Sequence, residues 1–142
     1  MKKLLLLVFC ASLFAGCASI GENLTEKQLK VEKEQKMGEM MLEAFKKQDF
    51  EKYIQFIPAG GRQTYNKDKF NEDQKEIASR MGKIDSYRFL TRLEKEPLHE
   101  FVWAVRFLSY SIKGKEVYKE ALFSIVVGEV DDTRKVFLFG FK

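Results

Sequence analysis

Apolar side chains recur at helical spacing in the first half of the chain. Thr25 and Gln28 form a capping box, which is typical of a helix start, so we expect a helix from Glu26. The first half of this helix is dominated by Lys, Glu and Gln. From residue 37 an apolar stripe follows, with the spacing of a helix that packs on a sheet. The stripe consists of Met37, Met40, Met41, Ala44 and Phe45.

Two shorter helices are predicted before residue 83. Asp49 can cap a helix that ends at Pro58 and the Gly60–Gly61 pair, and we interpret the glycine pair as a turn. Asn71 precedes two acidic residues and has a glutamine three positions later, a pattern that predicts a third helix start. Gly82 is a natural stop for that helix.

After residue 83 the period of the apolar positions changes from 3.6 to 2. Four segments are rich in β-branched and aromatic residues, which predicts strands. The segments are Ser86–Leu93, Glu100–Ile112, Glu116–Val130 and Lys135–Phe141. The connections between them have hairpin length, so neighbouring strands should be antiparallel.

One face of the predicted sheet is strongly aromatic. Alternation places on it Phe101, Trp103, Val105 and Phe107, then Phe123, Ile125 and Val127, then Phe137, Phe139 and Phe141. We expect the helices to cover this face. The candidate residues of an interior or ligand-facing surface are Trp103, Phe107, Phe123 and Phe139. Helices followed by a meander that curls around them predict an α+β fold, with N-terminal helices packed on a curved four-stranded antiparallel sheet.

The first sixteen residues have the three parts of a secretory signal peptide. Two lysines follow Met1, Leu4–Leu13 carries no charge, and small residues precede Cys17. The apolar stretch is too short to span a bilayer. Residues 14–17 resemble the lipobox of bacterial lipoproteins, although Phe14 stands where that family most often has Leu. The alternative is a plain signal peptide that contains a cysteine.

The resemblance implies that Cys17 becomes a lipidated N-terminus that anchors the protein to a membrane. Ala18 follows it, whereas the inner-membrane retention signal of bacterial lipoproteins is usually Asp. We therefore expect attachment to the bacterial cell envelope, at the outer membrane facing the periplasm if the cell has two membranes. The expected organisation is a signal peptide at 1–16, a tether at 17–24 and a single α+β domain at 25–142.

Cysteine content and charge narrow the function classes. Cys10 is lost with the leader, so Cys17 is the only cysteine left and the domain has no intramolecular disulfide. Removing Lys2 and Lys3 lowers the net charge from +4 to +2. Interspersed charges of both signs argue against nucleic-acid binding. We expect a monomer or a weak dimer, with a possible protein partner in the envelope.

The order of helices and strands resembles the small cystatin-like domains of the nuclear transport factor 2-like superfamily. The resemblance covers about residues 35–142, and it includes the Asp49–Phe50 helix start and the Gly82–Tyr87 entry into the sheet. It implies a cystatin-like roll. In that superfamily the same fold serves enzymes, binding proteins and domains with no known ligand, so it transfers little function.

The chain offers few groups for catalysis or metal binding. His99 is the only histidine, which excludes a two-histidine metal site, and we expect it to be a surface residue at a strand entrance. Asn66, Asp68 and Asp73 suggest a calcium loop, but Ile77 occupies the place of the bidentate acid of an EF-hand. We predict no metal, no cofactor and no identifiable catalytic residue.

The roll that the resemblance implies is cone-shaped. Several polar groups are able to line its interior, but no spacing between them singles out an acid–base pair. They are Tyr53, Tyr65, Tyr87, Tyr110, Tyr118 and Arg106. Arg106 is expected on the outer sheet face. Leu122, Val126 and Leu138 fall on the same face and could mark a partner surface.

Two function classes follow. The first is an envelope-anchored lipoprotein with a non-catalytic binding or interaction domain of unknown ligand. The second is a small isomerase-like or hydrolase-like enzyme that uses the interior of the cone. A cavity with an acid or Tyr of perturbed pKa would favour the enzyme, whereas a filled cone with an apolar outer face would favour the binding protein.

Overall fold

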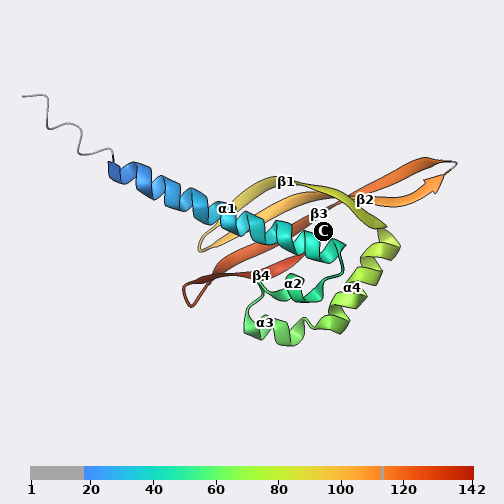
Figure 1. The fold of residues 1–142 in the computed structure, drawn as a ribbon, viewed down its shortest axis with the longest axis horizontal. Coiled ribbons are helices and arrows are strands. Elements are labelled where there is room, and N and C mark those ends of the chain that lie inside the picture. The colour runs from blue at the N-terminus through green and yellow to red at the C-terminus, as the bar shows by residue number, and fades with distance from the viewer. Residues whose placement is uncertain (1–17, 113) are drawn as a thin grey trace, which may run out of the picture. The chain divides into compact units, whose positions relative to one another are not determined.

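The computed structural model describes residues 18–112 and 114–142. The leader and Cys17 lie outside the described residues. The chain divides into two units between Lys33 and Glu34, and the second unit contains every element except the first part of helix α1. Figure 1 shows the order of the elements along the chain.

Helix α1 spans Ala18–Lys46, so the predicted start at Glu26 was wrong. Residues 18–24, expected to be an irregular tether, are helical. The physical reason is that this segment has no proline and contains Ala, Glu and Leu, which have high helix propensity. The capping box at Thr25 therefore lies inside the helix.

Helices α2 (Phe50–Ile54) and α3 (Ala59–Thr64) follow. Asp49 caps α2 by accepting a hydrogen bond from the Lys52 backbone nitrogen at 3.2 Å, as predicted. The Gly60–Gly61 pair, expected to be a turn, lies in α3. The low helix propensity of glycine is offset by Arg62, whose guanidinium donates 2.8 Å hydrogen bonds to the backbone oxygens of Ile57 and Gln55.

Helix α4 spans Lys67–Arg80. The predicted start at Asn71 was wrong, because Asn66 caps the helix earlier and accepts a 3.0 Å hydrogen bond from the Lys69 backbone nitrogen. The predicted stop at Gly82 is confirmed. Gly82 has a φ of +102°, and a Cβ there would lie 2.2 Å from the backbone oxygen of Leu108, so only glycine fits this close approach.

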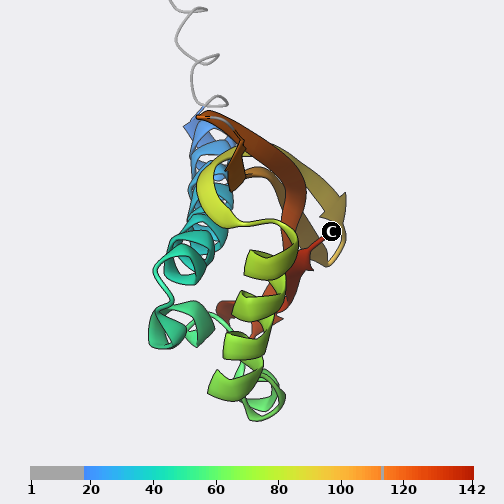
Figure 2. The same cartoon turned by 90° about the vertical axis from the view of Figure 1, so that its right-hand side faces the viewer.

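Four strands form one antiparallel sheet in chain order. They are β1 (Lys83–Lys95), β2 (Leu98–Ile112), β3 (Lys115–Val130) and β4 (Thr133–Phe141). Each contains the segment predicted for it, and the α+β class is confirmed. In Figure 2 the sheet curves, and α2, α4 and the part of α1 after Glu34 lie on one side of it.

The predicted aromatic face of β2 and β3 is the core of the second unit. All of its seven residues have 0% exposure: Phe101, Trp103, Val105, Phe107, Phe123, Ile125 and Val127. From α1, Met41, Leu42, Ala44 and Phe45 are buried, whereas Met40, predicted in the stripe, is exposed. The helix is rotated from the predicted orientation because Gly38 faces the sheet. A Cβ at position 38 would lie 2.1 Å from Cη2 of Trp103.

Strand β4 departs from simple alternation at one residue. Val126 pairs with Leu138 and Val127 with Val136, so Phe137 lies in a bulge. Val136 is buried in place of Phe137, which is exposed. The placement of Phe137 on the inner face was therefore wrong, because a bulge adds one residue and reverses the alternation.

The outer face of the sheet is partly apolar, as predicted. Leu138 is 66% exposed and Leu122 is also exposed, but Val126 is buried. Arg106 lies on this face, with its guanidinium carbon 3.7 Å from the centre of the Tyr118 ring. Glu100 is buried there, and hydrogen bonds from Lys142 and Lys95 lower its pKa from 4.5 to about 2.

The close contact between α1 and Trp103 generates a stability prediction. Gly38→Ala should destabilise the fold by about 2 kcal/mol, because the new methyl group overlaps the indole ring. Gly60→Ala is the matched control, since a Cβ at position 60 meets no atom within 4 Å. Urea unfolding of both variants tests this. An equal or higher stability of Gly38→Ala would contradict the close packing.

Candidate functional site

A pocket of about 470 Å³ lies between helices α2, α3 and α4 and strand β4. Its aromatic walls come from Tyr53 on α2, Tyr65 after α3, and Phe139 on β4. Its polar groups come mainly from α4, which supplies Asp73, Glu76 and Arg80. The pocket therefore forms only when helices α2, α3 and α4 are folded against strand β4.

The tyrosines are held by packing and by one carboxylate. The Tyr65 hydroxyl donates a 2.8 Å hydrogen bond to Oδ2 of Asp73. The ring of Phe139 meets Tyr65 edge to face at a centroid distance of 4.8 Å and Tyr53 at 5.5 Å. This arrangement of aromatic rings is favourable and fixes the wall of the pocket.

Burial changes the acid–base behaviour of both phenols. Desolvation raises the pKa of Tyr53 well above its ordinary value, and the neighbouring Tyr65 and Asp73 add to this effect. Desolvation also raises the pKa of Tyr65, with the hydrogen bond to Asp73 as the second cause. Both groups are therefore neutral hydrogen-bond donors at physiological pH. Neither is suited to remove a proton from a substrate.

The charged groups at the pocket form two ion pairs. Arg80 Nη1 lies 2.9 Å from Oε1 of Glu76, and both side chains are largely exposed. Lys69 Nζ lies 3.1 Å from Oδ1 of Asp73, but Lys69 does not line the pocket. Asp73 therefore combines a hydrogen bond from a phenol with an ion pair on its other oxygen.

The structure separates the predicted interior residues. Trp103, Phe107 and Phe123 are fully buried in the core and are not among the residues that line the pocket, whereas Phe139 is. Trp103 lies against α1 at Gly38. The space beneath Trp103 is therefore occupied by the helix, and the pocket opens elsewhere.

Sequence reasoning identified Tyr53 and Tyr65 as polar candidates but missed their connection to Asp73. The sequence patterns place Asp73 in the first turn of a helix and in a rejected calcium loop, and they give no role to Arg80. The three residues that meet at the pocket come from α2, the end of α3 and α4. These residues are brought together by the turns before and after α3, a helix that the sequence patterns did not predict. Their spacing along the sequence therefore does not reveal that they are neighbours.

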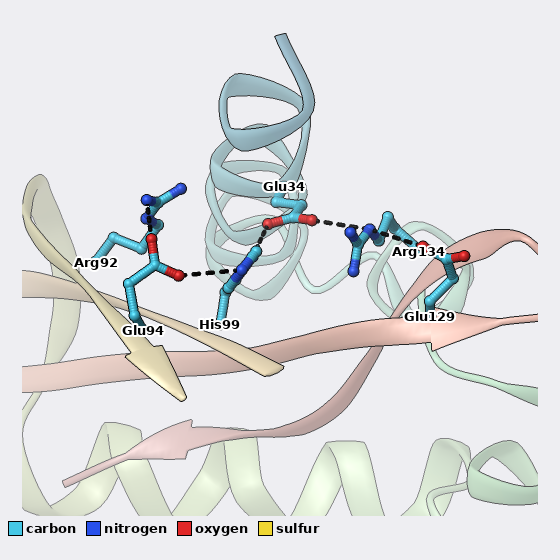
Figure 3. A network of polar contacts seen from close by, with 6 residues as sticks. All are labelled: Glu34, Arg92, Glu94, His99, Glu129 and Arg134. Atoms are coloured by element: carbon cyan, nitrogen blue, oxygen red, sulfur yellow. Dashed lines mark hydrogen bonds and ion pairs between the residues drawn. The ribbon is translucent and has the colours of Figure 1, made fainter. Parts of the chain in front are cut away.

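A second polar cluster, centred on Glu34 of α1, lies where the helix meets the sheet (Figure 3). Glu34 is fully buried. His99 Nδ1 lies 2.7 Å from Oε2 of Glu34, and Arg134 Nε lies 3.0 Å from its Oε1. The prediction that His99 is a surface residue was wrong, since its side chain is only 17% exposed.

The cluster continues outward from Glu34 on both sides. On one side, His99 Nε2 lies 3.2 Å from Glu94, which also pairs with Arg92. On the other side, Arg134 Nε lies 3.5 Å from Glu129. The Arg134 guanidinium and the polar His99 ring compensate the carboxylate that α1 buries. The arrangement fits a structural role, namely holding α1 on strands β2 and β4.

Other site types find no support in the described part of the chain. Within residues 18–112 and 114–142, no group of three or more His, Cys, Asp and Glu side chains is arranged to hold a metal ion. In the same residues, no helix is long and apolar enough to cross a membrane. Comparison with protein-family models, with curated proteins and with solved structures found no match.

The Glu34 cluster leads to a prediction about stability. Arg134→Ala should destabilise the protein by about 2 kcal/mol, because it removes one cation from a buried carboxylate while the burial remains. Arg80→Ala is the control, since it breaks an exposed ion pair and should cost about 0.5 kcal/mol or less. Thermal or urea unfolding compares the two. Equally small losses of unfolding free energy in the two variants would mean that the buried Glu34 carboxylate is not stabilised by Arg134.

Proposed function

We propose that the protein is an envelope lipoprotein, anchored through lipidated Cys17, whose domain binds a ligand or partner without catalysing a reaction. The observation that carries the non-catalytic part is the filled interior. Trp103, Phe107 and Phe123 are buried at 0% exposure, and α1 packs on Trp103 through Gly38. An enzyme that used this interior would need space for its substrate there.

We also propose that the domain is a cystatin-like roll. A cystatin-like roll is supported by the order of the elements, with helices before a four-stranded meander, and by the curvature of the sheet in Figure 2. Part of the outer sheet face is exposed, although Glu100 and Val126 on that face are buried. The exposed Leu122 and Leu138 are consistent with an envelope protein partner.

The anchored location follows from the leader and from the resemblance to the lipobox. Ala18 after Cys17 supports attachment to the outer membrane in a cell with two membranes. Interspersed charges of both signs in the domain argue against a nucleic-acid partner.

One observation favours the alternative, a small isomerase-like or hydrolase-like enzyme. The pocket of about 470 Å³ contains a tyrosine hydrogen-bonded to a carboxylate. However, the raised pKa of Tyr65 leaves a weak acid and no phenolate base at neutral pH. Turnover of a substrate that is lost in Asp73→Asn would make the enzyme the better proposal.

Lipidation is tested at Cys17. Cys17→Ser should prevent processing by the lipoprotein peptidase and incorporation of a palmitate label, because the thiol is the acylated group. Cell fractionation should then find the variant away from the membrane or retained as an unprocessed precursor. Equal labelling of the parent and Cys17→Ser would refute the anchor.

The filled interior is tested through Trp103, the only tryptophan. Its emission should be blue-shifted in the folded protein, because the indole has 0% exposure. Titration with small apolar or steroid-like compounds should leave the emission unchanged. A saturable spectral change would reveal a ligand space beside Trp103 and overturn the proposal of a filled interior.

A further inference from the structure

We propose that the pocket between α2, α3, α4 and β4 binds a small organic cation, namely an amine carried on an apolar body. This inference rests on the proposed binding function and names a ligand class for one site. It is carried by the aromatic wall, the charge balance in and beside the pocket and the partial burial of Asp73.

The wall offers aromatic rings to a ligand. Tyr65, Phe139 and Phe141 line the pocket and are only partly buried. Their inner neighbours hold them in place, since Phe139 packs edge to face on Tyr53 and Phe141 lies 5.3 Å from Phe45 between ring centroids. Rigid aromatic faces attract a cation as well as an apolar body.

The lining residues carry one more carboxylate than cation. Among the described residues that line the pocket, Asp73 and Glu76 are acidic and Arg80 is the only base. Arg80 is already paired with Glu76 at 2.9 Å. An anionic ligand would have to compete with Glu76 for Arg80. A cation would have to compete with Lys69 for Asp73, but Lys69 also lies 3.7 Å from Glu72, so the three carboxylates in and beside the pocket outnumber the two bases.

Asp73 is also in a suitable position. Its side chain is 28% exposed, so it is partly shielded from water but still accessible. Tyr65 donates to one of its oxygens and Lys69 pairs with the other from outside the pocket lining. Each carboxylate oxygen has two lone pairs, so Asp73 has acceptor capacity left for an ammonium group. A bond between an ammonium and a carboxylate is stronger than one between neutral groups.

The test compares three probes with the same body and different charge. Phenethylamine, 2-phenylethanol and phenylacetate carry a positive, zero and negative charge at neutral pH. Each is titrated into the full-length processed protein in detergent, and binding is followed by chemical-shift changes in two-dimensional NMR spectra. Phenethylamine should bind at least about tenfold more tightly than the other two, with shifts centred on Tyr65, Asp73 and Phe139.

Substitutions test whether the Asp73 carboxylate is the group that binds the ammonium. Asp73→Asn should weaken the binding of phenethylamine at least about fivefold. The affinity for 2-phenylethanol should stay the same, because the amide oxygen still accepts the Tyr65 hydrogen bond. Asp68→Asn is the matched control on the same helix, since Asp68 does not line the pocket. The unsubstituted protein provides a second measurement. Raising the salt concentration should weaken the binding of phenethylamine and leave the binding of the neutral 2-phenylethanol unchanged.

Each other outcome overturns the inference. Equal affinities for the three probes would show an uncharged apolar site, and preference for phenylacetate would show an anion site at Arg80. Absence of binding by all three would remove the site. None of these results changes the labelling of Cys17 or the emission of Trp103, so failure here is distinguishable from failure of the proposed function.

Discussion

The contact between Gly38 and Trp103 is the constraint on which the second unit depends. The indole occupies the place of a side chain on α1, so the helix axis lies closer to the sheet than a helix with a larger residue at this position would allow. This approach brings Met41 and Leu42 into the core. It also brings Glu34, one turn before Gly38, within reach of His99 and Arg134. Burial of a carboxylate is thus a consequence of the helix position, and the Arg134 guanidinium and the polar His99 ring beside it compensate the lost hydration.

The core and the pocket have different physical characters. The inner-face residues of β2 and β3 have no accessible surface, which is typical of close packing. The pocket instead lies where α2, α3 and α4 meet the last strand, and three of its aromatic residues, Tyr65, Phe139 and Phe141, are only partly buried. The pocket nevertheless adjoins the core, since the buried Phe45, Tyr53 and Ile57 are among its lining residues.

The strands were predictable because alternation with period 2 continues over many residues in β2 and β3. The bulge at Phe137 was not predictable, since a single inserted residue leaves no sign in the sequence. The orientation of α1 was missed because a hydrophobicity pattern gives no weight to Gly38. The Asn66 cap was missed because Asn71 offered a second, equally good capping pattern. The pocket joins residues from three helices, and sequence spacing alone contains no information about that arrangement.

The strand order has a consequence for the folding kinetics. Every strand pairs with its neighbour in the chain, so the sheet assembles by successive closure of short loops, each with a small loss of chain entropy. Helix α1 must instead contact Trp103, 65 positions along in sequence from Gly38, which requires closure of a much longer loop. The aromatic face of the sheet is consequently exposed to water in any intermediate that precedes helix docking. Apolar surface exposed in this way favours aggregation.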